Sequence, residues 1–200
     1  MIRQAKQTDA PFIIPPLYET IGAIGNTLAG TTDPTKTIEI LSAFFALPNN
    51  RLSYLNTWVL EMDHQIAGFF VAYAGDQSEQ LDRPFLDRSF SSESSKISID
   101  KEPEPGEFYL DTLYVHPNFR GQALGRQLLI AFEKIGSELG FSRFGLLVEK
   151  ENLPAYHLYQ KIGYHPDKEK RISETLYQHM ILEKRDEKIA LNLPLDFLLI

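Results

Sequence analysis

The sequence VHPNFRGQALG, residues 115–125, joins an apolar, β-favouring segment at 107–115 to a segment with helical periodicity. A helix that begins here, near Gly121, presents unpaired backbone N–H groups and a partial positive charge at its first turn. Small residues at 121, 123 and 125 let an anion approach the backbone closely, and Arg120 and Arg126 add positive charge. The stretch predicts either a site for a phosphate-bearing ligand or a plain strand-to-helix turn with a solvated arginine.

Two common phosphate-binding motifs do not fit this stretch. The phosphate loop of nucleotide hydrolases requires a Lys-Ser or Lys-Thr pair after its last glycine, and no such pair follows Gly125. The dinucleotide fingerprint places its glycines in the first strand-to-helix turn of a repeated parallel unit, with an acidic residue about 20 positions further on. The sequence therefore does not indicate either kind of nucleotide site.

Strand and helix patterns continue to alternate after this stretch. The helix that follows ends at Gly140 and has one apolar face, formed by Leu124, Leu128, Phe132, Ile135 and Leu139. A strand is predicted at Phe144–Val148, and Asn152 and Pro154 then begin a short helix that ends near Gly163. This alternation indicates a sheet covered by helices.

Two ordered motifs resemble those of the GNAT superfamily of acyl-CoA N-acyltransferases. Residues 120–125 are similar to its Arg/Gln-x-x-Gly-x-Gly/Ala signature, with Ala123 at a position where the family usually has glycine. The second motif is similar to the family's later pattern of Asn, Ala, Leu-Tyr and Gly-Phe/Tyr, and consists of Asn152, Ala155, Leu158, Tyr159, Lys161, Gly163 and Tyr164. The resemblance is strong over residues 107–164 and looser over the rest of the chain.

The resemblance implies an α/β (α+β) fold with a central mixed, mostly antiparallel sheet and helices on both faces. Two parallel strands, ending near Val115 and Val148, would splay apart and admit the pantetheine arm of acetyl-CoA, the expected cosubstrate. The pantetheine amides would pair with the backbone of Leu113, Tyr114 and Val115, and Asn152 would face the same arm. The pyrophosphate would contact Arg120, Gly121, Gln122, Ala123, Leu124, Gly125 and Arg126.

The resemblance places Tyr159 beside the thiol sulfur, where its neutral phenol suits a general acid for the departing thiolate. A base is also needed, because an alkylamine is mostly protonated at pH 7. Alternation along 107–115 predicts that Glu107, Tyr109, Asp111, Leu113 and Val115 share one face. Asp111 interrupts an apolar segment and is therefore either a base, an amine ligand or a salt-bridged structural residue. Glu107, at the edge of a loop, is expected to be solvated and is a second candidate base.

The composition excludes several classes of function. The chain has no cysteine, so disulfides and thiolate chemistry are excluded. Its five histidines lack metal-ligand spacing, so no metal site is expected. The net charge of −7 argues against nucleic-acid binding. Without a long apolar run or a signal peptide, neither membrane insertion nor secretion is expected, and a cytoplasmic enzyme is predicted.

One domain is predicted over residues 1–184. Its first half contains a helix with Leu17, Ile21, Ile24 and Leu28 on one stripe, a helix after Asp33 and Pro34, and a hairpin at 57–62 and 66–74. A last strand is expected at Leu176–Leu182. Residues 76–106 are interpreted as an acidic loop insertion with eight acidic and four basic residues. The apolar tail 185–200 would bury itself on its own domain or in a homodimer contact.

Together these features predict an N-acetyltransferase that moves an acetyl group from acetyl-CoA to a primary amine by direct attack. The acidic loop favours a cationic acceptor, such as a polyamine, an aminoglycoside-like compound or a lysine side chain. Two alternatives are a non-catalytic acyl-CoA-binding module of the same fold and a structural interaction protein that uses the apolar tail.

Overall fold

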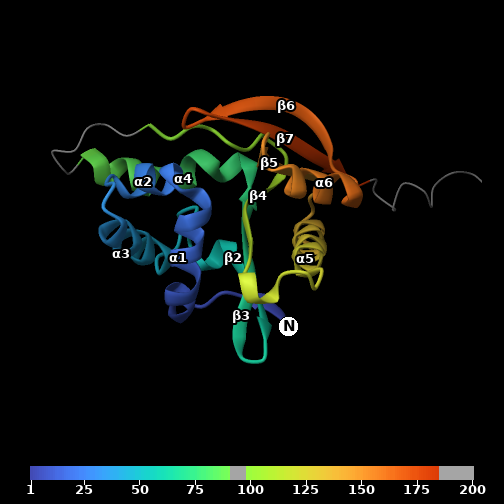
Figure 1. Cartoon of the computed structure of the whole chain (residues 1–200). Coiled ribbons are helices and arrows are strands. Elements are labelled where there is room, and N and C mark those ends of the chain that lie inside the picture. The colour runs from blue at the N-terminus through green and yellow to red at the C-terminus, as the bar shows by residue number, and fades with distance from the viewer. Residues whose placement is uncertain (91–97, 185–200) are drawn as a thin grey trace, which may run out of the picture.

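A computed structural model describes residues 1–90 and 98–184, which form a central sheet with helices on both faces (Figure 1). The strand order is β1-β2-β3-β4-β5-β7-β6. The strands are β1 (Ile2–Gln4), β2 (Thr57–Met62), β3 (Gln65–Ala74), β4 (Phe108–Val115), β5 (Arg143–Glu149), β6 (His165–Ile172) and β7 (Thr175–Glu183). The helices are α1 (Ala10–Ile21), α2 (Ala23–Ala29), α3 (Pro34–Phe45), α4 (Ser78–Phe90), α5 (Leu124–Glu138) and α6 (Leu153–Ile162).

β4 and β5 form the parallel pair of the sheet, and the other neighbouring strands are antiparallel. The β4–β5 ladder is short: Phe108 pairs with Phe144, and the last pair joins Leu110 to Leu146. Beyond this pair both strands continue, β4 to Val115 and β5 to Glu149, without pairing to each other. The expected fold class, including two splayed parallel strands, is confirmed.

A β-bulge interrupts β4 at Asp111. Val71 of β3 pairs with Thr112, whereas Ala72 pairs with Leu110, so Asp111 has no partner in the ladder. Such an extra residue reverses the side on which the following side chains point. Phe108 and Leu110 therefore pack on the same side as Leu113 and Val115. The prediction that the odd-numbered residues from 107 to 115 share one face is wrong for this reason.

Each face of the sheet has its own apolar core. On one face α5 packs on β3 and β4, with Phe132 of the helix stacked on Phe108 at 5.1 Å between ring centroids. On the other face lie α1, α2, α3 and α4, which contribute buried residues such as Leu17, Leu41 and Phe85. The two faces meet at the gap between β4 and β5, so residues from both cores can reach that gap.

Several local expectations need correction. The first helical stripe is two helices, because Gly22 adopts a positive φ of 48° and separates α1 from α2. Residues 78–90 of the expected acidic loop form α4, where Leu81 and Phe85 are buried. The last strand, β7, has an antiparallel partner, β6, whose mostly charged sequence gave no apolar alternation.

The tail at 185–200 and residues 91–97 of the expected acidic loop lie outside the described residues. Within the described part of the chain, no helix combines the length and apolar character that a membrane span requires.

Candidate functional site

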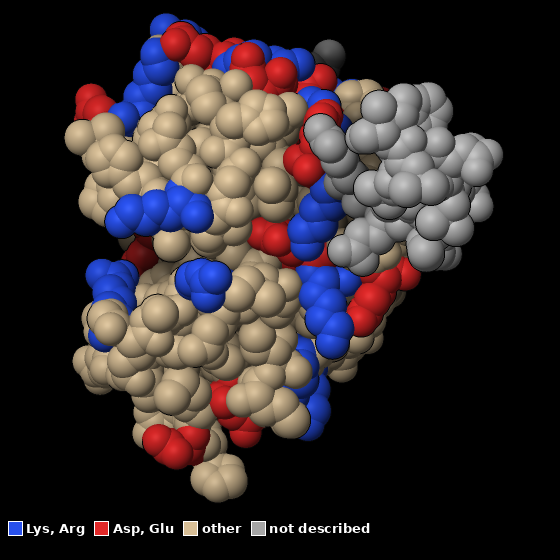
Figure 2. All heavy atoms as spheres, turned by 90° about the vertical axis from the view of Figure 1, so that its right-hand side faces the viewer, with Lys and Arg blue, Asp and Glu red and all other residues tan. Residues whose placement is uncertain are grey.

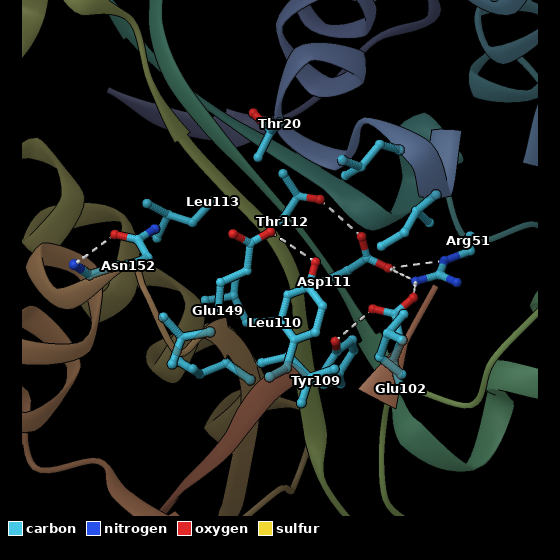
Figure 3. A pocket seen from close by; sticks show the side chains of 18 of the residues that line it. Thr20, Arg51, Glu102, Tyr109, Leu110, Asp111, Thr112, Leu113, Glu149 and Asn152 are labelled. Atoms are coloured by element: carbon cyan, nitrogen blue, oxygen red, sulfur yellow. Dashed lines mark hydrogen bonds and ion pairs between the residues drawn. The ribbon is translucent and has the colours of Figure 1, made fainter. Parts of the chain in front are cut away.

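A pocket of about 240 Å³ opens where β4 and β5 separate. The separating strands form two of its walls, and the helices on both faces of the sheet contribute to it (Figure 3). Residues of α1 and α2 reach it from one side and residues at the start of α6 from the other: Thr20, Ile21, Ile24 and Leu28, and Ala155, Tyr159 and the N-cap Asn152. The short β4–β5 ladder thus creates the pocket, because a continued ladder would close the gap.

A buried ionic group lies along one side of the pocket, and we call it the Arg51 cluster. Arg51, Glu102 and Asp111 line the pocket, and Asp82 lies behind them on Arg51. Arg51 is 2% exposed and donates to Asp111 Oδ2 from Nε at 3.0 Å and from Nη2 at 2.5 Å. Its Nη2 also donates to Glu102 Oε1 at 2.5 Å, and its Nη1 lies 3.5 Å from Asp82 Oδ1. Figure 3 shows Arg51 between Asp111 and Glu102.

Acidic groups outnumber basic groups at this site. Among the described residues the lining includes one cation, Arg51, and three carboxylates, those of Glu102, Asp111 and Glu149, which together have a formal charge of −2. Burial raises the pKa of Glu102 and of Asp82, although Arg51 opposes the rise. The excess negative charge suits a cationic ligand.

The opposite wall carries the groups expected to meet the cosubstrate. Asn152 caps α6, and its Oδ1 accepts a hydrogen bond from the Ala155 N–H at 3.2 Å. Tyr159 is 8% exposed, and burial raises the pKa of its phenol to about 12. Its hydroxyl has no hydrogen-bond partner within residues 1–90 and 98–184, so it is a neutral donor available to a ligand.

The segment 120–126 leads into α5 outside this pocket. The helix begins at Leu124 rather than at Gly121, because Ala123 adopts the left-handed conformation with φ 55° and ψ 21°. Gly121 also has a positive φ, of 79°. Among the residues that the structure describes, no side chain caps the helix, and Gly121, Gln122 and Ala123 are exposed. These exposed backbone donors fit a pyrophosphate.

Positive side chains lie near this face of the molecule. Arg120 and Arg126 are exposed, and Arg120 Nε donates to the Val115 carbonyl at 3.1 Å. Figure 2 shows the face that bears α5 and α6, where Lys and Arg side chains flank a hollow. The surface charge around α5 is therefore compatible with an anionic group.

The structure brings Asp111, Leu113, Asn152 and Tyr159 together in the pocket. Tyr114 points to the other face of the sheet, where it stacks on Phe69 at 5.2 Å. Val115 lies at the end of β4 and packs against the core beside α5.

Glu107 does not line the pocket and is fully buried, so the expectation that it is solvated is wrong. Its Oε1 accepts a hydrogen bond from the Glu104 N–H at 2.8 Å and lies 3.2 Å from His179 Nε2. Main-chain and histidine contacts at this depth hold the carboxylate inside the protein, away from the gap between β4 and β5.

Sequence reasoning missed other lining residues, notably Arg51, Thr112, Glu149 and Tyr177. Arg51 lies in the loop after α3, where no periodic pattern marks it. Glu149 is the last residue of β5. Its position at the end of a strand that was expected to splay from its neighbour could have marked it as a pocket residue.

Comparison with known proteins agrees with this geometry. The sequence model of the acetyltransferase (GNAT) family matches residues 31–164. A solved structure described as an acetyltransferase is 28% identical, covers 92% of this chain and 100% of its own, and has a TM-score of 0.76. An N-acetyltransferase from Staphylococcus aureus Mu50 is 20% identical over 91% of this chain and 100% of its own, with a TM-score of 0.78, and shows the fold alone.

A third solved structure, Ard1 from Thermoplasma volcanium, is 15% identical over 93% of this chain and 98% of its own, with a TM-score of 0.58. No curated protein matches the chain. The family match covers more than half of the sequence, and the chain therefore belongs to the acetyltransferase (GNAT) family. It is an acyltransferase, a member of a family whose fold supports acyl transfer from acetyl-CoA to amine acceptors.

Proposed function

We propose that this protein is an N-acetyltransferase that moves an acetyl group from acetyl-CoA to a cationic primary amine by direct attack. The observation that carries the proposal is the pocket where β4 and β5 separate, with the hydroxyl donor Tyr159 on one wall and an anionic cluster on the other. A thioester placed in this gap would have an acid on one side and an amine-binding surface on the other.

Acetyl-CoA would bind along the outer part of the gap. Beyond Leu110, the edge of β4 that faces β5 has no strand partner in the described structure, so Leu113–Val115 can pair with the pantetheine amides. The pyrophosphate would contact the backbone N–H groups at 121–126, with Arg120 and Arg126 supplying positive charge. Asn152 lies at the pocket and would face the pantetheine arm.

The reaction requires two proton movements. The ammonium of the acceptor gives up one proton, and the neutral nitrogen attacks the thioester carbonyl carbon. When the carbon–sulfur bond breaks, Tyr159 donates its phenolic proton to the thiolate, and the second proton of the nitrogen restores the phenol through water. The products are an amide, free coenzyme A and the proton that the ammonium released.

The anionic lining supports a cationic acceptor. An alkylammonium near Asp111 and Glu149 would offset one of the two excess negative charges of the lining. Asp111 would act mainly through its fixed negative charge, because Arg51, Tyr73 and Thr112 already donate hydrogen bonds to it. Glu107 lies outside the pocket, so the second expected base has no direct path to the amine.

The test combines binding and turnover. Titration calorimetry with acetyl-CoA should register binding, and thiol release should follow when amines such as spermidine or a lysine peptide are added. Tyr159→Phe should lower kcat by about 10²-fold or more, as expected for loss of a general acid, with unchanged affinity for acetyl-CoA. Tyr156→Phe removes a hydroxyl from the same helix outside the pocket and is the matched control.

Two results would contradict the proposal. If calorimetry registers no heat with acetyl-CoA, acetyl-CoA is not the cosubstrate. If acetyl-CoA binds but no amine causes thiol release, the protein does not catalyse the proposed transfer. Equal losses in Tyr159→Phe and Tyr156→Phe would show that the helix, rather than the Tyr159 hydroxyl, is what matters.

A further inference from the structure

The three carboxylates that line the pocket differ in how firmly they are held. Asp111 and Glu102 are both paired with the buried Arg51. Glu149 stands apart from this cluster, at the end of β5, and its side chain is exposed (Figure 3). This difference separates the carboxylates that can exchange a proton from those that are fixed.

Asp111 has little capacity left for a proton. Its Oδ2 accepts hydrogen bonds from Arg51 Nε at 3.0 Å, from Arg51 Nη2 at 2.5 Å and from the Tyr73 hydroxyl at 2.8 Å. Its Oδ1 accepts from the Thr112 hydroxyl at 3.0 Å. A carboxylate offers about four lone-pair positions, so these donors occupy most of them. Taking a proton would also break a charge-assisted pair with Arg51.

Glu102 is restricted in the same way. Arg51 Nη2 donates to its Oε1 at 2.5 Å, and the Tyr109 hydroxyl donates to its Oε2 at 2.9 Å. The residue is 6% exposed and each of its carboxylate oxygens already accepts a hydrogen bond, so it is poorly placed to take a proton from an amine in the pocket. Neither Asp111 nor Glu102 therefore has an oxygen as open to the amine as that of an unpaired carboxylate.

Glu149 has the opposite properties. Its Oε1 accepts one hydrogen bond, from the Tyr177 hydroxyl at 3.0 Å, and its Oε2 has no partner in the described part of the chain. The neighbouring cation, Lys150, is paired with Glu169 of β6 and does not neutralise it. Glu149 shares the pocket with Tyr159 and Asn152, and in Figure 3 its carboxylate turns toward Thr112 across the gap.

We propose that Glu149 is the catalytic base that accepts the proton of the acceptor ammonium, while Tyr177 orients it. This inference rests on the proposed amine acetylation. An N–H bond of the ammonium breaks, and an O–H bond forms on Glu149 Oε2. The neutral amine then attacks the thioester, and the exposed Glu149 passes its proton to water, which returns the carboxylate for the next turnover.

The test uses two small nucleophiles that need little specific recognition. Methylamine is almost entirely protonated at pH 7, as alkylamines with a pKa of about 10.4 are, whereas hydroxylamine is largely neutral. With saturating acetyl-CoA, Glu149→Gln should lower thiol release with methylamine by about 10²-fold, the range of general base catalysis. With hydroxylamine, which needs no such deprotonation, the same variant should fall less than about threefold. Glu151→Gln, an exposed carboxylate outside the pocket, is the matched control.

Each outcome decides the question. A methylamine-selective loss that shrinks as the pH rises toward the pKa of the amine supports the assignment. Equal loss with both nucleophiles, a deficit that stays constant with pH, or no loss would overturn it. Calorimetry with acetyl-CoA separates the two proposals: a wild-type protein that binds acetyl-CoA but acetylates neither nucleophile would overturn the proposed amine transfer, and this inference with it.

Discussion

Two groups of charged side chains lie at opposite ends of the short ladder that β4 makes with β5. The Arg51 cluster contains Asp111, just after the last ladder pair, and faces the pocket. The second group, which we call the His179 cluster, consists of Glu107, Arg143, Asp167 and His179. None of its members lines the pocket. Glu107, just before β4, and Asp111, within it, thus have different surroundings, and the sheet decides which of the two carboxylates a substrate can reach.

The two clusters also differ in charge balance. In the Arg51 cluster one guanidinium faces three carboxylates, and burial raises the pKa of Glu102. In the His179 cluster burial alone would raise the pKa of Asp167, but the hydrogen bond from His179 and nearby positive charges bring it below its usual range. In the Arg51 cluster the carboxylates outnumber the one cation by two, whereas in the His179 cluster a guanidinium and an imidazole face two carboxylates.

The largest effect should come from removing the cation of the Arg51 cluster. Arg51→Met leaves buried carboxylates without their partner, which should cost about 3–5 kcal/mol in the free energy of unfolding. Arg51→Lys keeps the charge without the planar fork and should lose less. Urea denaturation measures both. Adding Glu102→Gln and Asp111→Asn to Arg51→Met should restore much of the lost free energy of unfolding. An Arg51→Met variant as stable as wild type would contradict the role of Arg51 as the partner of these carboxylates.

A smaller effect is expected from Glu107→Gln in the His179 cluster. The change removes a buried charge that meets His179 at 3.2 Å, with Arg143 Nε at 3.9 Å, and should cost about 1–3 kcal/mol. Because Glu107 lies outside the pocket, kcat measured well below the unfolding temperature should stay close to wild type. A large fall in kcat without a fall in stability would show instead that Glu107 acts as the base.

The smallest effect on stability at pH 7 is expected for Glu102→Gln. This change removes one of the excess carboxylates, while Arg51 remains paired with Asp111. The pKa of Glu102 is raised on folding, so its contribution to stability is present below its usual pKa and is lost as the pH rises. As the pH falls from 7 to 5, protonation of Glu102 should therefore add to the free energy of unfolding of the wild type. The Glu102→Gln variant should lack this addition. At pH 7 the two should agree within about 1 kcal/mol.

Glu104→Gln is the matched comparison with the opposite sign. The hydrogen bond from Lys170 lowers the pKa of Glu104, so its stabilisation is present above its usual pKa and is lost as the pH falls. This variant should lose less than about 1 kcal/mol at pH 7, because the pair is partly exposed. Urea midpoints at pH 5 and pH 7 for both variants would test the two signs; identical pH slopes would contradict the charge balance described above.

Local sequence signals predicted the parts of the fold that depend on local chemistry. The Asp33–Pro34 pair indicated α3, and Asn152 with Pro154 indicated α6, because caps and first-turn prolines act within a few residues. The charged strand β6 was missed, since it lies at the edge of the sheet and has little apolar surface to bury. The left-handed conformation of Ala123 was not predicted, because glycine is the residue that usually indicates a positive φ.

The site was harder to predict because it depends on contacts between distant segments. Arg51 and Asp111 are 60 positions apart, and nothing in either local sequence indicates their pairing. The bulge at Asp111 also invalidated a face argument that assumed regular alternation along β4. Asn152 and Tyr159 both line the pocket, and the sequence could predict them because a motif, rather than periodicity, marked them.

The brevity of the β4–β5 ladder has a mechanical consequence. Strands β1 to β4 and strands β5 to β7 form two antiparallel halves, and only three residue pairs join them along the seam. Side chains above the seam add to the attachment, since Phe132 of α5 stacks on Phe108 and meets Phe144 edge-on, at 5.1 Å and 5.6 Å between ring centroids. A molecule lodged in the open part of the seam would extend the missing pairing and hold the halves as one body. The cosubstrate would then be a temporary strand of the sheet, and its departure would loosen the whole protein.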